Sequence, residues 1–286
     1  MGRGIYLIGS TVALFALCVG DAAAAPMPGD EKAEAVALYR GARALQKTKQ
    51  CRPALKRAER ALALFEDHQP PLPKHVARVQ TLRARCARDL KNYKLLLAIE
   101  QARLQSASAD AEFPPLKLGY AYQRAANAHV NLKEYDLALP LYDSALEAYR
   151  RAPSGAKRLI ALLLGWRGKA LLNAGRTQMA VPDLKAYTDY ARRAYKDSPT
   201  KLSGALSWLK TAYRRMKAYD QALAVLSDQQ AAYEDRSIKF KETLLGLHVE
   251  RVELLSNSGQ LEKATAELKV ATKKGEAWFK PDNKAL

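Results

Sequence analysis

The sequence predicts an all-α fold built from six stacked helix–turn–helix repeats. Three observations lead to it: a repeat period equal to the spacing between Ala138 and Ala180, prolines gathered in one short part of each repeat, and a composition rich in the helix-favouring residues Ala, Leu, Lys, Arg and Glu. The chain has 286 residues, of which 48% are apolar and 27% are charged. This balance indicates a globular protein rather than a disordered one.

The period is clearest in one column of alanines. Steps of this length forward and back from Ala138 meet alanine four times and leucine once, at Ala180, Ala222, Ala264, Ala54 and Leu96. The repeats are then 35–76, 77–118, 119–160, 161–202, 203–244 and 245–286. Eight of the 13 prolines fall within a window of five columns near the end of the repeat. Proline cannot continue a helix, so this window marks where one repeat ends.

Each repeat is predicted to hold two helices, A and B. Helix A covers the last three columns before the repeat and its first 14 columns, and helix B covers columns 18–34. A recurring Lys-x-Tyr phrase stands between them at Lys91, Lys133 and Lys217, and glycine replaces the lysine at Gly175 and Gly259. Glycine tolerates the positive φ that a turn requires. Small residues let the helix backbones approach closely in helix A, at Ala42, Ala84, Ala126 and Gly168.

The N-terminus is predicted to be a signal peptide of residues 1–24. Arg3 precedes an apolar run, 5–19, and small residues then favour cleavage after Ala24. The run is shorter than the ~20 residues that a membrane span needs, which disfavours a retained anchor. The bulky Leu17 disfavours a lipoprotein signal at the next residue, a cysteine.

Cleavage would leave a short lead-in, 25–34, followed by the repeat domain, 35–286. The mature protein is therefore expected to be exported, either periplasmic or secreted, with no stable membrane span. Export also places the remaining cysteines, Cys51 and Cys86, in an oxidising compartment. Both are expected on neighbouring helix ends at the same level of the array. We hypothesise a disulfide between them, with two buried thiols as the alternative.

The repeat pattern resembles the tetratricopeptide repeat (TPR). Repeat 119–160 carries the resemblance best, at Ala126, Tyr135, Ala138, Tyr142 and Ala145. The usual TPR is about 34 residues long, and a 42-residue version is similar to that of kinesin light chains. The resemblance covers nearly all of the mature chain. It implies an α-solenoid, a right-handed superhelix of helix pairs with a concave face.

The resemblance also implies which side chains line the concave face, namely columns 2, 5, 9, 12 and 13 of helix A. These columns hold basic, amide and aromatic residues: Arg43, Lys47, Arg78, Arg85, Arg88, Tyr120, Gln123, Asn127, Asn131, Lys169, Asn173, Arg214, Arg215 and Asn257. Basic side chains can hold carboxylates, and asparagine can pair with a peptide backbone. The alternative for each residue is a solvated charged face.

The formal net charge of +18 favours anionic partners. We expect a non-catalytic interaction scaffold of the cell envelope that binds a protein or peptide, of acidic character, through a basic concave groove. The alternative is a binder of an anionic envelope polymer such as a glycan. Nucleic acid is disfavoured because Lys and Arg are spread through every repeat instead of clustering with aromatic residues.

No catalytic, metal or cofactor site is expected. The four histidines lie in different repeats or loops, and no glycine-rich phosphate loop is present. His129 falls in a core column and is expected to pack there. Trp166 and Trp208 stand one repeat period apart and are expected to pack between adjacent A helices, with a ligand contact as the alternative. The last predicted helix, 261–275, carries six charged residues and is expected to be a solvated terminal cap.

Overall fold

A computed structural model describes residues 30–70, 72–108, 113–152, 156–234 and 239–279. Within these ranges the chain forms twelve helices, arranged in repeated pairs, and no strand. The all-α repeat fold is thereby confirmed. The predicted signal peptide, 1–24, lies outside the described residues.

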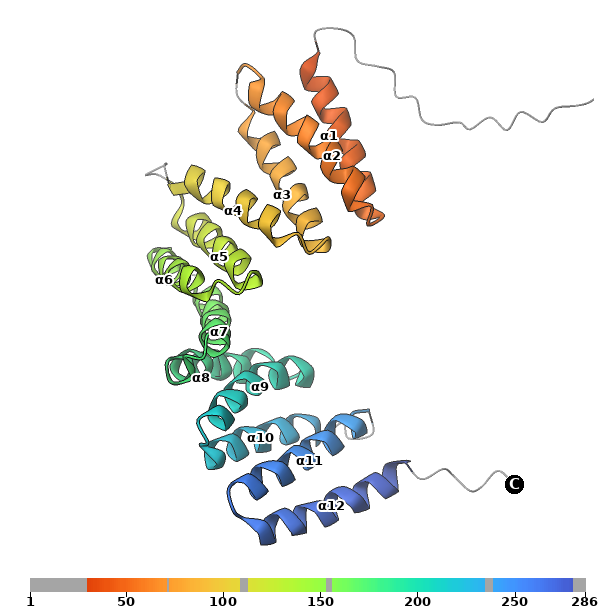
Figure 1. Cartoon of the computed structure of the whole chain (residues 1–286), viewed down its shortest axis with the longest axis vertical. Coiled ribbons are helices and arrows are strands. Elements are labelled where there is room, and N and C mark those ends of the chain that lie inside the picture. Colours follow the sequence, from red (N-terminus) through yellow and green to blue (C-terminus); the bar gives the residue numbers. More distant parts are fainter. Residues whose placement is uncertain (1–29, 71, 109–112, 153–155, 235–238, 280–286) are drawn as a thin grey trace, which may run out of the picture. The chain divides into compact units, whose positions relative to one another are not determined.

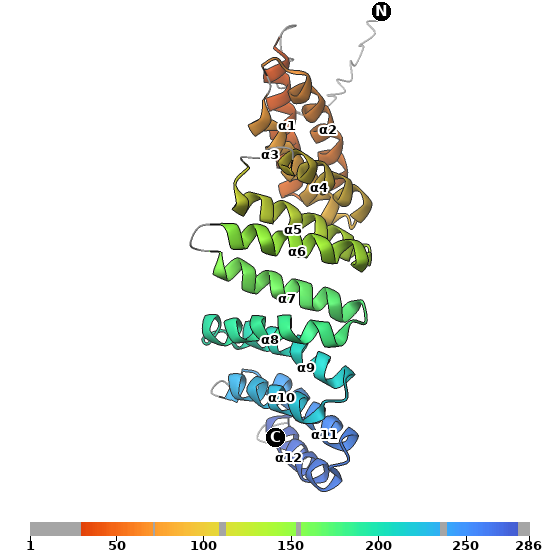
Figure 2. The same cartoon turned by 90° about the vertical axis from the view of Figure 1, so that its left-hand side faces the viewer.

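The described helices belong to two compact units that divide after Leu90, inside the second predicted repeat. In the first unit α1, α2 and α3 follow one another as a packed group (Figures 1 and 2), in which each helix packs on the next and the first also contacts the third. Its helices are α1 (Glu31–Lys47), α2 (Cys51–Asp67) and α3 (Pro73–Asp89).

The second unit contains the other nine described helices, and each of them packs on its successor (Figures 1 and 2). Helix α7 also contacts α9, two places further on. The helices are α4 (Tyr93–Ser108), α5 (Pro115–Asn131), α6 (Tyr135–Arg151), α7 (Lys157–Asn173), α8 (Thr177–Ala194), α9 (Pro199–Arg215), α10 (Tyr219–Glu234), α11 (Lys241–Asn257) and α12 (Leu261–Phe279).

The turn between the A and B helices has the same backbone form in all six repeats. The residue in the Lys-x-Tyr lysine column has a positive φ each time: 60° at Lys49, 55° at Lys91, 63° at Lys133, 57° at Lys217, and 78° at both Gly175 and Gly259. In five of these turns the next backbone N–H reaches back five residues, as from Gln50 to the Leu45 carbonyl at 2.9 Å. This is the Schellman arrangement, which satisfies carbonyls that the end of helix A leaves unpaired. The B helix then starts at the tyrosine column.

The core of each helix pair depends on the predicted small and alanine columns. Ala42, Ala126 and Ala138 have no exposed surface. At Gly168 an added Cβ would lie 2.8 Å from Leu184 Cγ, so this position has no room for a side chain. Lys210 breaks the small-residue column: it is 5% exposed, and its ammonium group pairs with Glu250 of α11 at 2.5 Å. An ion pair with the next A helix is therefore found at a position where the first four repeats have a small side chain.

Candidate functional site

Three of the predicted site residues meet in a groove between α1 and α3. We call it the arginine groove; it has a volume of about 590 Å³ and is lined by Tyr39, Arg43, Ala77, Arg78, Thr81 and Arg85. On α1 the lining residues are four apart, and on α3 Arg78, Thr81 and Arg85 are three, four and seven apart, with Ala77 beside them, so each set lies on one helix face. Since α1 and α3 contact each other, their two faces form one surface within the first unit.

The arginines of the groove are exposed and pair with no carboxylate among the described residues. Other arginines of the same unit do have such partners: Arg60 pairs with Glu34, and Arg83 lies 3.7 Å from Glu59. A guanidinium group keeps its charge and presents five N–H donors in a planar fork that fits carboxylate, phosphate or sulfate oxygens. The groove therefore concentrates three cations whose donors face solvent.

Lys47 and Arg88 do not line the groove. Both are exposed and belong to the last turns of α1 and α3. A cation at this end of a helix interacts favourably with the unpaired carbonyls of the last turn. Their placement is thus explained by helix stability, and any contact with a ligand stays a prediction.

The amide residues predicted for the concave face of the second unit are partly used inside the protein. Tyr142 donates its hydroxyl to Asn127 Oδ1 at 2.6 Å, and Tyr149 donates to Gln123 Oε1 at 2.7 Å. Asn131 donates to the Asn127 backbone carbonyl at 2.9 Å. Burial raises the pKa of both tyrosines, which keeps each hydroxyl protonated as a donor. Asn127 therefore helps to fix α6 on α5, a role that the periodicity alone did not indicate.

Lys169 lies against two tryptophans. Its ammonium nitrogen is 4.4 Å from the ring centroid of Trp208 and 5.9 Å from that of Trp166, both within cation–π range. Trp208 packs against the core of the second unit, whereas Trp166 is 48% exposed. The two tryptophans of the A helices α7 and α9 are thus connected by Lys169, whose ammonium group lies near both rings.

The remaining predicted residues are distributed along the second unit. Arg214 lies 3.8 Å from Glu253 of α11, and Arg215 donates to the Leu172 carbonyl. Asn173 and Asn257 are exposed at the ends of α7 and α11. In the described part of the second unit, the structure brings the predicted cations next to carboxylates, carbonyls or aromatic rings. Only the first unit groups them in one groove.

No protein-family model matches the sequence, and no curated protein matches it either. Solved structures do. A putative kinesin light chain of Podosopora anserina with nearly identical TPR-like repeats matches at TM-score 0.58 and 14% identity, over 71% of this chain and 97% of that one. BtubC from P. vanneervenii matches at 0.56 and 13%, over 90% and 96%. The apo form of RapI matches at 0.54 and 14%, over 88% and 87%. The fold is TPR-like. At these identities the likeness concerns the fold alone.

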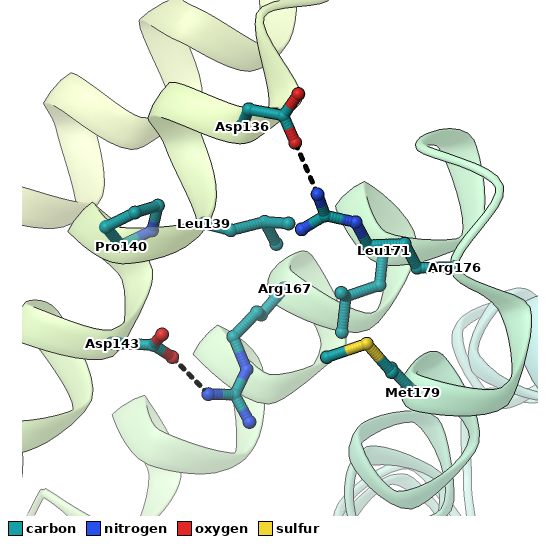
Figure 3. Close-up of a pocket in the computed structure, with 8 residues that line it drawn as sticks. All are labelled: Asp136, Leu139, Pro140, Asp143, Arg167, Leu171, Arg176 and Met179. Atoms are coloured by element: carbon teal, nitrogen blue, oxygen red, sulfur yellow. Dashed lines mark hydrogen bonds and ion pairs between the residues drawn. The ribbon is translucent and has the colours of Figure 1, made fainter.

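A second pocket of this TPR-like array lies between α6, α7 and α8 and has a volume of about 460 Å³ (Figure 3). Leu139, Pro140, Leu171 and Met179 supply apolar walls. Its two arginines are both paired, Arg176 with Asp136 at 2.6 Å and Arg167 with Asp143. Because its charges are balanced from within, this pocket is a weaker candidate for an anion than the arginine groove. It lies outside the predicted concave columns, and no sequence signal pointed to it.

Several buried polar side chains were not predicted from the sequence. Glu100 is 2% exposed and lies 3.3 Å from both Arg103 and Arg124. Asp183 is 5% exposed and takes two hydrogen bonds from Arg167, at 2.6 and 2.7 Å. These bonds, above all others, raise the pKa of Arg167. His129 is buried as expected, and its Nδ1 lies 2.7 Å from Glu134. Contacts of this kind fix the TPR-like pairs in register.

Metal ligation and membrane spanning find no support in the part of the chain that the structure describes. No three His, Cys, Asp or Glu side chains gather there in a group that could hold a metal ion. None of the described helices combines the length and the hydropathy that crossing a bilayer requires.

Cys51 and Cys86 come together in the first unit, as predicted, and both are buried free thiols. Cys51 Sγ lies 3.7 Å from Asp89 Oδ2. Burial, followed by a hydrogen bond with Cys51, raises the pKa of Cys86 to about 12. The disulfide stays a prediction: oxidation would remove two protons and two electrons from the pair, which a disulfide-exchange catalyst of an oxidising compartment accepts.

Thiol counting tests this disulfide. Protein recovered from an exported fraction and unfolded without reductant is expected to give no free thiol from Cys51 and Cys86, and two after reduction. In the folded, reduced protein both thiols should react slowly at pH 8, because they are buried and Cys86 stays protonated. Two free thiols in the unfolded, unreduced sample would contradict the disulfide. A Cys51→Ser variant serves as the control.

Proposed function

We propose that the protein is an exported, non-catalytic scaffold whose arginine groove binds an acidic segment of a protein partner. The observation that carries the proposal is the meeting of Arg43, Arg78 and Arg85 in one groove, each exposed and without a carboxylate partner among the described residues. The TPR-like fold supports the proposal because stacked helix pairs offer extended surfaces for partners. The predicted signal peptide supports export.

The groove favours carboxylates that are spaced along an extended chain. Arg78 and Arg85 are seven residues apart on α3, which separates their Cα atoms by ~10.5 Å along the helix axis. A peptide in the extended polyproline II conformation advances ~3.1 Å per residue and completes one turn in three residues, so acidic side chains three residues apart lie on one face and span ~9.3 Å. Tyr39 also lines the groove wall, whereas the Thr81 hydroxyl is donated to the Ala77 carbonyl at 2.8 Å. An acidic peptide with this spacing is therefore the partner that the groove fits best.

The alternative is an anionic envelope polymer, held by the net charge of +18 rather than by the groove. The salt dependence of binding distinguishes the polymer from the acidic peptide. A polymer bound through many dispersed ion pairs is released steeply as salt rises, because exposed charges lose their interaction beyond the Debye length. Bidentate arginine–carboxylate contacts in a groove keep part of their strength, since both groups are closer together than that length.

The test is the binding of a fluorescently labelled peptide with glutamates every third residue, compared with the same peptide carrying glutamines. The groove variant Arg43→Gln, Arg78→Gln, Arg85→Gln removes three charges. The control variant Arg52→Gln, Arg150→Gln, Arg193→Gln removes three charges from exposed positions outside the groove. Loss of two to three ion pairs predicts at least a ~10-fold weaker affinity for the groove variant, by fluorescence anisotropy, and a change below ~3-fold for the control.

Equal losses in both variants would show that binding follows net charge. Polygalacturonate, a carboxylated polysaccharide, is then measured in the same way at low and high salt. Binding to it that both triple variants weaken alike, and that salt abolishes, would replace the scaffold proposal with the polymer alternative. Equal affinity for the glutamate and glutamine peptides would overturn acidic recognition altogether.

A further inference from the structure

Helix α12 presents an apolar stripe to solvent, against the expectation of a solvated cap. Leu261 is 65% exposed and Leu268 is 52% exposed. Thr265 and Thr272 share their helix face and donate their hydroxyls at 2.9 Å to the carbonyls of Leu261 and Leu268. With their hydroxyls bonded to the helix backbone, the threonines offer methyl groups to the surface. The charged residues of α12 flank this stripe rather than cover it.

The same column is buried in every earlier B helix. Leu268 corresponds, in steps of one repeat period, to side chains that are 0–2% exposed: Ala58, Glu100, Tyr142, Leu184 and Leu226. Each of their helices is followed by an A helix that packs on it. No described helix follows α12. The α12 stripe is therefore a surface of the kind that faces the following repeat elsewhere in the chain, and among the described residues no helix covers it.

Helix α1 carries the other half of such a contact. Ala37 and Ala44 are exposed. Their equivalents in the five later A helices are 0–8% exposed, since an earlier B helix covers them: Val79, Ala121, Leu163, Ala205 and Leu247 for Ala37, and Cys86, Ala128, Ala170, Ala212 and Leu254 for Ala44. No described helix precedes α1. A row of small side chains is thus open here.

The two open surfaces are complementary in size. The α12 stripe has large side chains, and the α1 surface, Ala33, Ala37 and Ala44, has small ones. A similar row of alanines, Ala121, Ala125 and Ala128, faces away from solvent on α5, which packs on α4. Small residues let helix backbones approach closely, and small residues occupy the equivalent positions in other repeats of this chain.

We propose that a second copy of this chain occupies these surfaces, with α12 of one copy packed on α1 of the next. The contact repeats between copies the stacking that each copy already uses between its own repeats. It joins two different surfaces, so it is heterologous and can add further copies in a row. Each copy keeps its own arginine groove, and the inference does not depend on what that groove binds.

Salt should act on this association in the opposite sense to groove binding. Two chains that each carry a formal charge of +18 repel one another, and salt screens that repulsion. The apolar contact itself is not weakened by salt. Self-association should therefore strengthen as salt rises, whereas binding of the glutamate peptide should weaken. The two proposals can fail independently.

The test is the size distribution of the full chain, as cells produce it, by sedimentation velocity over a concentration series at high salt. Wild type should form dimers and larger species. Leu268→Glu and Ala37→Glu each place a charge in one surface and should remain monomeric. An equimolar mixture of the two variants should form dimers and nothing larger, because each variant keeps one competent surface. Ala266→Glu, on the same helix outside the stripe, should behave as wild type.

Circular dichroism of each variant checks folding, and all changes are at exposed positions. A wild-type protein that stays monomeric at every concentration overturns the proposal. So does a monomeric Leu268→Glu variant beside an Ala37→Glu variant that still dimerises, since that result means two α12 helices pair with each other. A mixture that stays monomeric likewise excludes the head-to-tail contact.

Discussion

Replacing Asp183 with alanine is expected to lower the free energy of unfolding of the second unit by about 3 kcal/mol. Asp183 is 5% exposed and receives two hydrogen bonds from Arg167. Without this carboxylate the half-buried guanidinium group of Arg167 keeps only its pairing with Asp143, whose side chain is 62% exposed. A charge that has lost its buried partner costs more than the pair had contributed, because it has already been removed from water.

Urea denaturation measures this effect, with tryptophan fluorescence as the probe. The chain has three tryptophans, and Trp166, Trp208 and Trp278 all lie in the second unit. Asp136→Ala is the matched control, from the pocket that Arg167 lines (Figure 3), because Asp136 also pairs with an arginine but its side chain is 82% exposed. It should cost less than about 1 kcal/mol. Equal losses would mean that burial does not determine the strength of these pairs.

Replacing Gly119 with alanine is expected to cost about 2–3 kcal/mol in the same unit. The added Cβ would lie 2.5 Å from two ring carbons of Tyr149. That ring cannot withdraw easily: it has no exposed surface, its hydroxyl is bonded to Gln123, and Tyr120 packs edge-on against it with centroids 5.5 Å apart. Either α5 must move away from α6 or the tyrosine must leave its position.

Gly204→Ala is the control, because Gly204 also lies within a helix but an added Cβ would meet nothing within 4 Å. It should raise stability by about 0.8–1 kcal/mol, the helix preference of alanine over glycine. A second test combines Gly119→Ala with Tyr149→Leu. If the clash is the cause, alanine should cost much less on the leucine background than on wild type. Additive losses would contradict this explanation.

The repeat period predicted the helices closely, and the reason is visible in the turns. Every described helix starts one residue before its predicted column, and each B helix starts two residues after a left-handed residue that recurs once in every repeat. Backbone geometry at those columns depends on residues that are neighbours in sequence. The alanine column recurs with the same period, and each of its alanines is buried, at 0–4% exposure.

The chemistry of the surface could be predicted only in part. Arg43 and Arg85 lie in the same column of adjacent repeats, and Arg78 lies two turns from Arg85 on the same helix face, so their meeting followed from the period. Whether a polar group faces solvent or a neighbour depends on the neighbour's side chain, which the period does not specify. Asn127 has Tyr142 opposite it, and Lys169 has Trp208. The open surface of α12 was missed because its charged residues are visible in the sequence, whereas the direction of Leu268 is not.

The lysines in the left-handed turns contribute to the charge of this protein, but the turns themselves do not require their side chains. Four of six turns place lysine where glycine fits without steric strain, and the left-handed conformation costs a lysine on the order of 1 kcal/mol. Glycine at Lys49, Lys91, Lys133 and Lys217 would therefore keep every turn and relieve that strain, while removing four positive charges. Substitutions in these turns alone could therefore change the electrostatic field of the protein while leaving its helices, core and arginine groove unaltered.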